Sequence, residues 1–387
     1  MTMVGGPAPL VLSVFATFAT GGPQVRFAAV ANHHGQAFRH AIVAMDGRLD
    51  CAERLSSHLN VSFPKVPIRR GAFLANLASF RHALRSIAPD VLVTHNWGSI
   101  EWAMANLAPG GVRRHVHIED GFGPEEARGQ IRRRVLTRRL VLRRSTVVLP
   151  SLTLQRIATE VWRLPVRQLR NVPNGLDLAH FQPHGSAAIL PVSGEGPLVG
   201  TVAALRTEKN LGRLLRAVRL LRNEGVRLRL AVVGDGPERP MLEALAAQLG
   251  IAEMVVFAGA IADPAAIYRA FDLFALSSDT EQMPLSVLEA MATGLPVAAT
   301  AVGDVPRMLA PENQPFLCAC DDAALAQALS RLLADAATRR QVGRANRTRA
   351  EHDYNQQVMF RAYGELFGMP LCSNPDTGHG VLVTHSY

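Results

Sequence analysis

The most informative stretch of this sequence is SSDTEQMPLSVLEAMATGLPV, residues 277–297. An apolar run ends just before it at Leu276. Pro284 is typical of the first turn of a helix, and Gly294 with Pro296 closes that helix. The pattern predicts a strand, a loop and a short helix, which together form one unit of a parallel α/β sheet. The start of such a helix carries free backbone N–H groups beside the end of a strand, and these groups suit an anionic phosphate.

Two glutamates in this stretch are candidates for ligand binding. The spacing predicts that an apolar stripe faces the core, formed by Val287, Leu288, Met291 and Leu295. Glu289 lies on another face of the helix, where its carboxylate can accept hydrogen bonds from the vicinal hydroxyls of a ribose. Glu281 precedes the helix and would lie near whatever group the phosphate carries. The plainer interpretation makes Glu289 an exposed helix residue and Glu281 a carboxylate at a helix start.

The same alternation of strand and helix extends over most of the chain and predicts two doubly wound, Rossmann-like α/β domains facing a central cleft. The expected strands are 10–17, 90–95, 114–118, 146–150, 168–172, 198–203, 228–233, 254–258, 272–276 and 296–300. Residues 181–197 are rich in Pro, Gly and Ser and lack helical periodicity, so the domain boundary is placed there.

The domain organisation follows from that boundary. We expect an N-terminal domain over 1–182, a linker over 183–197 and a C-terminal domain over 198–354. A helix at 355–369 is expected to pack back on the N-terminal domain, and a poorly ordered tail follows over 370–387. The apolar face predicted for that helix consists of Val358, Met359, Ala362, Tyr363 and Leu366.

The composition is that of a soluble globular protein, with 48% hydrophobic and 19% charged residues among 387. Apolar runs are too short to cross a bilayer. The four cysteines lack paired or metal-binding spacing, which favours a reducing cytoplasm. A net charge of +9 makes an anionic partner plausible: a nucleic acid, a membrane surface or a phosphorylated substrate. All but two of the 41 basic residues are arginine, so Lys209 stands out.

Two further loops follow predicted strands of the second half. In residues 200–210, Arg206 and Lys209 can neutralise a departing diphosphate; alternatively they are solvated residues near a helix start. Gly234 and Gly236 let the backbone approach a ligand, although a tight structural turn explains them equally well. No third glycine follows at the spacing of a dinucleotide-binding fingerprint, which removes the main support for an oxidoreductase.

The first half offers candidates at two strand ends. Gly21 and Gly22 lie at a strand-to-helix turn. His117, Glu119 and Asp120 place an imidazole and two carboxylates at the end of another strand. His117 is equally well explained as a hydrogen-bonded structural histidine. No His, Cys and Asp set has metal-ligand spacing.

The segment from Gly129 to Arg144 has seven arginines beside an apolar stripe, formed by Ile131, Val135, Leu136, Leu140 and Leu142. A basic amphipathic helix can bind an anionic membrane, which suits a lipid-linked acceptor and a peripheral location on the inner face of the plasma membrane. The alternative is a domain-covering helix with a solvated basic face. Nucleic-acid binding is not expected, because interleaved aromatic residues for base stacking are lacking.

Residues 277–297 resemble the E-x7-E signature of the retaining GT-B glycosyltransferases of family 4, also called glycosyl transferases group 1. The resemblance continues in five other segments: 20–24, 171–177, 200–210, 233–237 and 257–259. It implies transfer of a sugar from a UDP- or GDP-linked donor to a saccharide or lipid-linked acceptor in cell-envelope polysaccharide, lipopolysaccharide or glycolipid synthesis. No cofactor or metal is implied, because in this family the leaving phosphate deprotonates the acceptor.

The resemblance also implies residue roles. Glu289 would hold the nucleotide ribose, Glu281 would face the transferred sugar, and Lys209 matches the family's lysine. His117 would contact the donor sugar, with Glu119 or Asp120 on the acceptor side. The remaining donor-binding candidates are Gly21, Gly22, Arg206, Gly234, Gly236, Pro284 and Leu285.

The sequence departs from the family pattern in three places. Ala203-Ala204-Leu205 replaces Gly-Arg-Leu, so Arg206 is the candidate substitute for the missing arginine. Gln282 and Met283 replace Gly-Phe beside the sugar. The acidic residue expected after a Gly-Gly pair is absent, because Gly303-Asp304-Val305-Pro306 leads to Arg307. Two rival functions remain: a GT-B nucleotide-sugar epimerase, and a non-enzymatic basic adaptor for membrane or nucleic acid.

Overall fold

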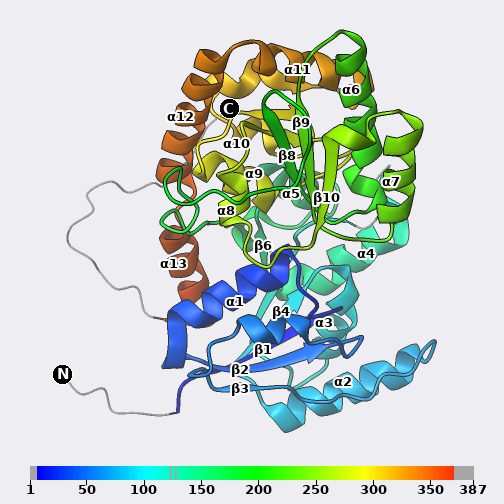
Figure 1. Ribbon diagram of the computed structural model, residues 1–387. Coiled ribbons are helices and arrows are strands. Elements are labelled where there is room, and N and C mark those ends of the chain that lie inside the picture. The colour runs from blue at the N-terminus through cyan, green and yellow to red at the C-terminus, as the bar shows by residue number, and fades with distance from the viewer. Residues whose placement is uncertain (1–6, 123, 127–128, 370–387) are drawn as a thin grey trace, which may run out of the picture.

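The computed structural model describes residues 7–122, 124–126 and 129–369, and the predicted tail at 370–387 lies outside these residues. The chain forms two α/β domains, which lie one above the other in Figure 1. Each domain has a parallel sheet with helices on both faces. The predicted fold class is confirmed. Such strands are buried on both faces, which is why they appear in the sequence as nearly continuous apolar runs.

The N-terminal sheet has the strand order β3-β2-β1-β4-β5-β6-β7. Its strands are β1 Leu10–Phe15, β2 Arg39–Ala44, β3 Val61–Ser62, β4 Val91–His95, β5 Arg114–Ile118, β6 Thr146–Leu149 and β7 Leu169–Asn171. Its helices are α1 Gly22–His34, α2 Phe73–Ile87, α3 Ile100–Asn106, α4 Arg132–Val141 and α5 Leu152–Glu160. Side chains alternate between the two faces of a strand, so Val11 packs on the α1 side and Leu12 on the α2 and α3 side.

The C-terminal sheet has the order β10-β9-β8-β11-β12-β13. Its strands are β8 Leu198–Val202, β9 Arg229–Val233, β10 Val255–Gly259, β11 Leu273–Leu276, β12 Val297–Thr300 and β13 Leu317–Cys318. Its helices are α6 Leu211–Asn223, α7 Arg239–Gln248, α8 Ala265–Tyr268, α9 Leu285–Ala292, α10 Val305–Met308, α11 Asp322–Ala334 and α12 Ala336–Asp353. In each sheet the strand that comes first in the chain, β1 or β8, lies inside the sheet, and later strands are added on both sides of it. The point where the strand order reverses opens a crevice at the carboxyl ends of the strands.

All predicted strands are present, with ends shifted by at most two residues. The prediction missed β2, β3 and β13. The strand β2 begins with Arg39 and His40, which hide its short apolar run, and the other two strands are each two residues long. Pairing with a neighbouring strand, rather than a local pattern, makes these segments strands.

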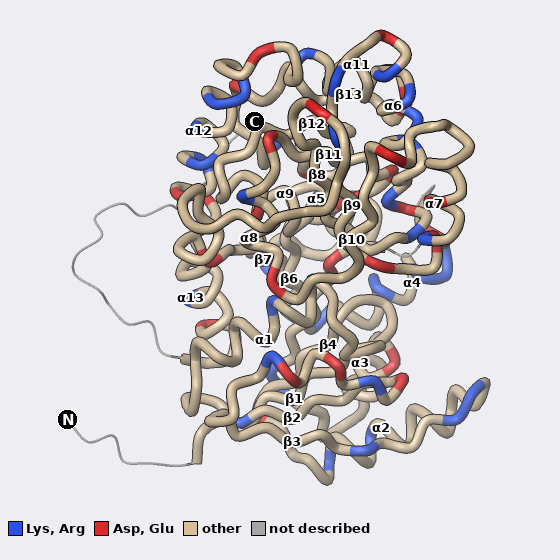
Figure 2. The backbone as a smooth tube through the Cα atoms, in the orientation of Figure 1, with Lys and Arg blue, Asp and Glu red and all other residues tan. Residues whose placement is uncertain are grey.

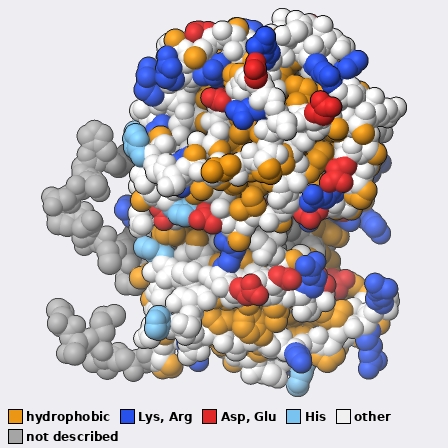
Figure 3. All heavy atoms as spheres, in the orientation of Figure 1, with side chains coloured by type: hydrophobic (Ala, Val, Ile, Leu, Met, Phe, Trp, Pro, Cys, Tyr) orange, Lys and Arg blue, Asp and Glu red, His pale blue; other side chains and the backbone are white. Residues whose placement is uncertain are grey.

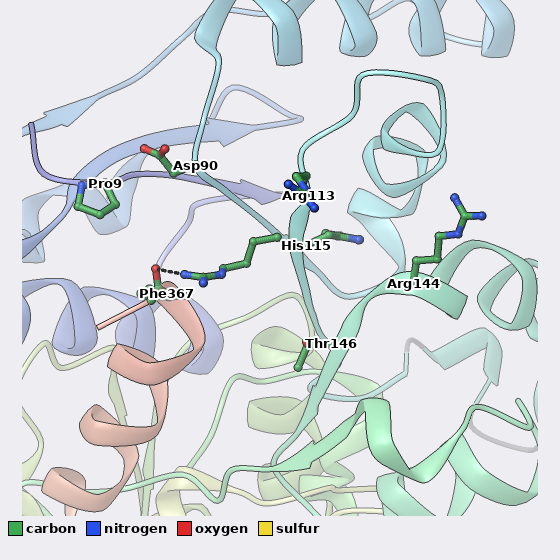
Figure 4. A pocket seen from close by; sticks show the side chains of 9 residues that line it. Pro9, Asp90, Arg113, His115, Arg144, Thr146 and Phe367 are labelled. Carbon is green, nitrogen blue, oxygen red and sulfur yellow. Dashed lines mark hydrogen bonds between the residues drawn. The ribbon is translucent and has the colours of Figure 1, made fainter. Parts of the chain in front are cut away.

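The last helix, α13 Gln356–Phe367, lies beside α1 on the N-terminal domain (Figure 1). Arg114 at the start of β5 donates a hydrogen bond of 3.0 Å to the Phe367 carbonyl at the end of α13. Asp90, Arg113 and Phe367 line a hollow at the same edge of the sheet, where the strands begin (Figure 4). The predicted apolar face needs one correction. Val358 is 60% exposed, and Phe360 and Phe367 are buried instead.

The chain crosses to the C-terminal core slightly earlier than the composition indicated. Leu176 and Phe181 already pack with the C-terminal domain. Leu176 also pairs with Asn355, so the outgoing and returning segments cross side by side. Two adjacent crossings bring the two sheets together around one cleft.

Candidate functional site

A hollow of about 600 Å³ lies between the two domains, at the carboxyl ends of both sheets. The N-terminal domain contributes Trp97 and Asp120 after β4 and β5. The C-terminal domain contributes Arg206, Lys209 and Glu281 from the loops after β8 and β11. In the space-filling view, acidic and basic side chains gather on both sides of the junction between the domains (Figure 3). Four of the predicted site residues therefore face one cleft.

Lys209 and Glu281 form an ion pair in this cleft. Lys209 Nζ donates to Glu281 Oε1 over 2.6 Å, and Ser278 Oγ donates to the same oxygen over 2.7 Å. The lysine side chain is 24% exposed and the glutamate side chain 9%. The cation thus lies at the cleft and is paired with a neighbouring carboxylate. The sequence analysis named the lysine and the glutamate but missed Ser278.

The loop that carries Lys209 is braced against the end of β11. Asn210 adopts a left-handed conformation with φ of 41° and its side chain caps α6 by accepting from the Arg213 amide. Arg213 donates to the Ser277 carbonyl over 2.6 Å and to Asp279 over 2.6 Å. These contacts join the loops after β8 and β11, so the positions of Lys209 and Glu281 are set together.

Glu289 lies on α9 and is bound by Tyr268. The Tyr268 hydroxyl donates to Glu289 Oε2 over 2.7 Å. Burial raises the pKa of the Glu289 carboxyl to about 6, against the opposing effect of the Tyr268 hydrogen bond. Oε1 remains as an acceptor for a ligand hydroxyl. The predicted apolar stripe of this helix is confirmed, since Val287, Leu288, Met291 and Leu295 are all buried.

The start of α9 meets the first helix of the other domain. Pro284 occupies the N-cap position, so the helix begins at Leu285. A Cβ atom added to Gly22 would lie 3.6 Å from Leu285 Cδ1, which places the turn before α1 against the start of α9. The two segments predicted to bind the donor phosphates therefore face each other across the domain junction.

The glycines after β9 have a structural explanation. A Cβ on Gly234 would lie 1.9 Å from the Ala203 carbonyl oxygen, and one on Gly236 would lie 2.5 Å from the Leu205 carbonyl oxygen. Both glycines permit close packing of the 234–236 loop on the loop that leads to Lys209. Neither lines the hollow described above. Their role in donor binding stays a prediction.

The structure corrects the expectation for His117. The side chain is fully buried, and its Nδ1 hydrogen-bonds to Thr94 Oγ1 over 2.8 Å. Thr94 also contacts His115 Nε2 at 2.9 Å, so the two histidines belong to one internal network. His117 Nε2 lies 3.7 Å from Glu119 Oε2, and His117 is not among the residues that line the hollow.

Glu119 needs the same correction. It follows β5 on the same face and is fully buried, and Arg138 Nε donates to its Oε2 over 3.1 Å. Arg138 also binds Glu126, and its guanidinium is packed against aromatic rings of Trp97, Phe122 and Trp162 at 4.9–5.3 Å. Glu119 is therefore part of a buried ion pair and does not present a free carboxylate to the cleft.

Asp120 is the carboxylate that does face the cleft. Arg26 of α1 holds it through two hydrogen bonds of 2.5 and 2.9 Å and donates a third to Asn174. Asn174 in turn donates to the Met283 carbonyl over 2.9 Å. This chain of contacts connects Asp120 in the N-terminal domain with the segment before α9. The sequence analysis missed Arg26 and Asn174, because neither stands in a recognisable motif.

The arginine-rich segment is divided between interior and surface. Arg134 pairs with Glu125 and Glu126, and Arg138 pairs with Glu126, so these two arginines are not part of the expected solvated basic face. The predicted apolar stripe is also wrong at Leu136 and Leu140, which are 56% and 50% exposed. The exposed arginines of this segment are Arg132, Arg133, Arg139, Arg143 and Arg144. Figure 2 shows basic positions along α4 at the right side of the molecule.

Within residues 7–122, 124–126 and 129–369, no three His, Cys, Asp or Glu side chains are grouped as ligands of a metal ion. Among the helices in these same ranges, none is both long and apolar enough to cross a bilayer.

Comparison with known proteins identifies the family. The model of Glycosyltransferase Family 4 matches residues 20–180, and that of Glycosyl transferases group 1 matches residues 187–349. A putative colanic acid biosynthesis glycosyltransferase of Escherichia coli, WcaL, is 29% identical over 58% of this chain and 57% of its own length.

Two solved structures share the fold. Sucrose-phosphate synthase of Thermosynechococcus elongatus superposes with a TM-score of 0.76 at 20% identity, over 93% of this chain and 98% of the other. Anabaena HepE in complex with UDP-glucose gives a TM-score of 0.77 at 16% identity, over 92% and 98%. At these identities the superpositions bear on the fold alone.

Proposed function

Since this chain belongs to the group 1 glycosyltransferases and has the GT-B fold, we propose that it transfers a sugar from a nucleotide diphosphate sugar to an acceptor hydroxyl with retention of configuration. The observation that carries the proposal is the Lys209–Glu281 pair, which faces the interdomain cleft beside the start of α9. The donor is UDP- or GDP-linked. The acceptor belongs to cell-envelope polysaccharide, lipopolysaccharide or glycolipid synthesis. The name of WcaL, a putative glycosyltransferase of colanic acid biosynthesis, supports the first of these.

The residues have distinct tasks in this mechanism. Glu289 accepts hydrogen bonds from the ribose of the donor. Lys209 leaves Glu281 to bind the diphosphate, whose charge grows as the glycosidic bond breaks, and the N–H groups at the start of α9 add to this stabilisation. Glu281 is then free to bind hydroxyls of the transferred sugar. Arg206 is exposed in the same cleft and adds a second cation.

The acceptor binds on the N-terminal side, next to Asp120. Closure of the two domains orients its hydroxyl and excludes the water that otherwise hydrolyses the donor. The leaving phosphate takes the proton of the acceptor on the same face of the sugar. Neither a metal ion nor a protein base is part of this proposal.

A donor screen tests the assignment. We expect one class among UDP-, GDP- and ADP-sugars to raise the melting temperature, because a ligand that binds only the folded state stabilises it. That donor should then be hydrolysed slowly, or its sugar transferred with an unchanged anomeric configuration, at the same rate with and without EDTA. Release of an epimerised nucleotide sugar would support an epimerase instead, and the absence of stabilisation by every donor would contradict the proposal.

We further propose that the outer face of α4 binds an anionic membrane. Leu136 and Leu140 are exposed between Arg132, Arg133 and Arg139, so apolar side chains and cations share one surface. Such a surface inserts its apolar residues at the headgroup boundary while the cations bind anionic lipid. A peripheral location on the inner face of the plasma membrane brings a lipid-linked acceptor to the cleft.

Vesicle binding checks this surface. Reversing the charges of Arg132, Arg133 and Arg139 to glutamate should weaken sedimentation with phosphatidylglycerol vesicles at least about tenfold, because each cation near such a surface contributes about 1 kcal/mol. The matched control replaces Arg222, Arg340 and Arg344, three exposed arginines of the other domain, by glutamate, so that the net charge changes by the same amount. Equal loss of binding in the two triple variants would assign the affinity to overall charge.

A further inference from the structure

Asp304 of the C-terminal domain binds the first turn of α5 in the N-terminal domain. The Leu152 amide donates to Asp304 Oδ2 over 2.6 Å, and the Thr153 amide and hydroxyl donate to Oδ1 over 3.0 and 2.6 Å. Arg307 approaches Oδ1 at 3.4 Å, and the carboxylate side chain is 8% exposed. A buried carboxylate at the positive end of a helix makes strong, charge-assisted hydrogen bonds. Here those bonds join the two domains.

The backbone beside Asp304 rests on the segment that carries Glu281. The Asp304 amide donates to the Gln282 carbonyl over 2.9 Å. Gly303 has φ of 55°, and a Cβ at this position would lie 2.1 Å from the Glu281 carbonyl oxygen. The turn at 303–304 is therefore pressed directly against residues 281 and 282, and a shift of Asp304 is transmitted to the site.

A second contact reaches the same segment from α5. Ser151 caps α5 by accepting from the Leu154 amide, and its hydroxyl donates to Gln282 Oε1 over 3.3 Å. The start of α5 thus touches the 281–282 segment directly through Ser151 and indirectly through Asp304. Both contacts need the two domains to be together, and the Leu152 and Thr153 amides need an acceptor when the domains separate.

We propose that Asp304 is a positioning residue that couples domain closure to the placement of Glu281 and Lys209. This inference rests on the proposed function and deepens it. When α5 docks on Asp304, the 303–304 turn holds the 281–282 segment in place, so that Glu281 and Lys209 both face the donor site. Asp304 stands where the sequence departs from the family pattern, at Gly303-Asp304-Val305-Pro306-Arg307.

Kinetics of Asp304 variants test the coupling. We expect Asp304→Ala to lower kcat about 10- to 100-fold, because small misplacements of reacting groups have effects of this size. The KM for the donor should change less than about threefold, because the nucleotide contacts on α9 remain in place. Asp304→Asn keeps one acceptor oxygen and should recover part of kcat. Thr153→Val removes a donor from the other domain and should be non-additive with Asp304→Ala in a double-mutant cycle.

The matched control is Asp321→Ala. Asp321 caps α11 within the C-terminal domain by accepting from the Ala324 amide, so its loss affects a helix cap but no contact between domains. This variant should keep the kcat of the wild type. Equal kcat values for Asp304→Ala and wild type, or additive effects of the Asp304 and Thr153 variants, would overturn the inference.

Small-angle scattering separates this inference from the proposed function. Without any substrate, Asp304→Ala should show a larger radius of gyration than both the wild type and Asp321→Ala, because the domains are held together less tightly. Unchanged scattering would refute the coupling even if sugar transfer is confirmed. A wild-type protein with no transferase activity would refute the proposed function, while scattering would still decide whether Asp304 holds the domains together.

Discussion

Replacing Lys209 by alanine is expected to lower kcat for sugar transfer about 10²- to 10³-fold, the usual effect of removing one group that stabilises charge in a transition state. Lys209 Nζ is the cation held 2.6 Å from Glu281 in the cleft. The diphosphate gains negative charge as the glycosidic bond breaks, so the interaction is stronger in the transition state than with bound donor. The loss should therefore appear mainly in kcat. Steady-state kinetics with the donor found in the screen measure it.

The second lysine of the sequence provides a control for this experiment. Lys65 is the only other lysine in the sequence, and it lies exposed in the N-terminal domain. Lys65→Ala should transfer sugar like the wild type. Lys209→Arg keeps the charge on a different headgroup and should recover part of the rate. Near-normal kcat for Lys209→Ala, with circular dichroism unchanged, would remove Lys209 from the mechanism.

Replacing Glu289 by alanine is expected to weaken nucleotide binding at least about tenfold, because hydrogen bonds to a charged group contribute about 1.5–3 kcal/mol each. Its free oxygen is the proposed acceptor for ribose hydroxyls, and Tyr268 holds the other oxygen at 2.7 Å. Isothermal titration with UDP or GDP measures the affinity. Glu243→Ala removes an exposed helix carboxylate of the same domain and should leave binding unchanged.

The pH dependence of binding gives a second measurement of the same residue. Burial raises the pKa of Glu289 to about 6, so the free protein carries this group largely protonated below pH 6 and ionised above it. The ribose hydroxyls donate to the ionised form, and binding therefore favours the loss of the proton. Nucleotide affinity should weaken as the pH falls through about 6. Glu289→Gln should remove this pH dependence, and an identical pH profile for that variant would contradict the assignment.

The sequence predicts an element correctly wherever the residues of one short segment are enough to define that element. The apolar run to Leu276, Pro284 and Gly294 predicted β11, its loop and α9, because strand propensity and helix boundaries depend on neighbouring residues. Lys209 and Glu281 were found in the same way, since each follows a strand at the edge where ligands bind. The two-domain architecture followed from repeating that unit.

Local sequence patterns do not predict contacts between segments that are far apart in the chain. His117 and Asp120 stand in one motif, yet His117 is buried against Thr94 whereas Asp120 reaches the cleft and binds Arg26. The direction of each side chain depends on the twist and packing of β5 and its neighbours. Likewise, the arginines of α4 are similar in sequence, but Arg138 is enclosed by aromatic rings and carboxylates while Arg139 is exposed.

The sequence by itself determined the fold class, ten of the thirteen described strands and the cleft-edge loops with Lys209 and Glu281, because hydrophobic periodicity and turn residues act over a few positions. Only the tertiary structure decided which charged groups are paired. Asp304 and Leu152 are separated by 152 residues in the chain and meet at 2.6 Å. The burial and hydrogen bonding of such groups depend on how the two domains pack, which no local segment encodes.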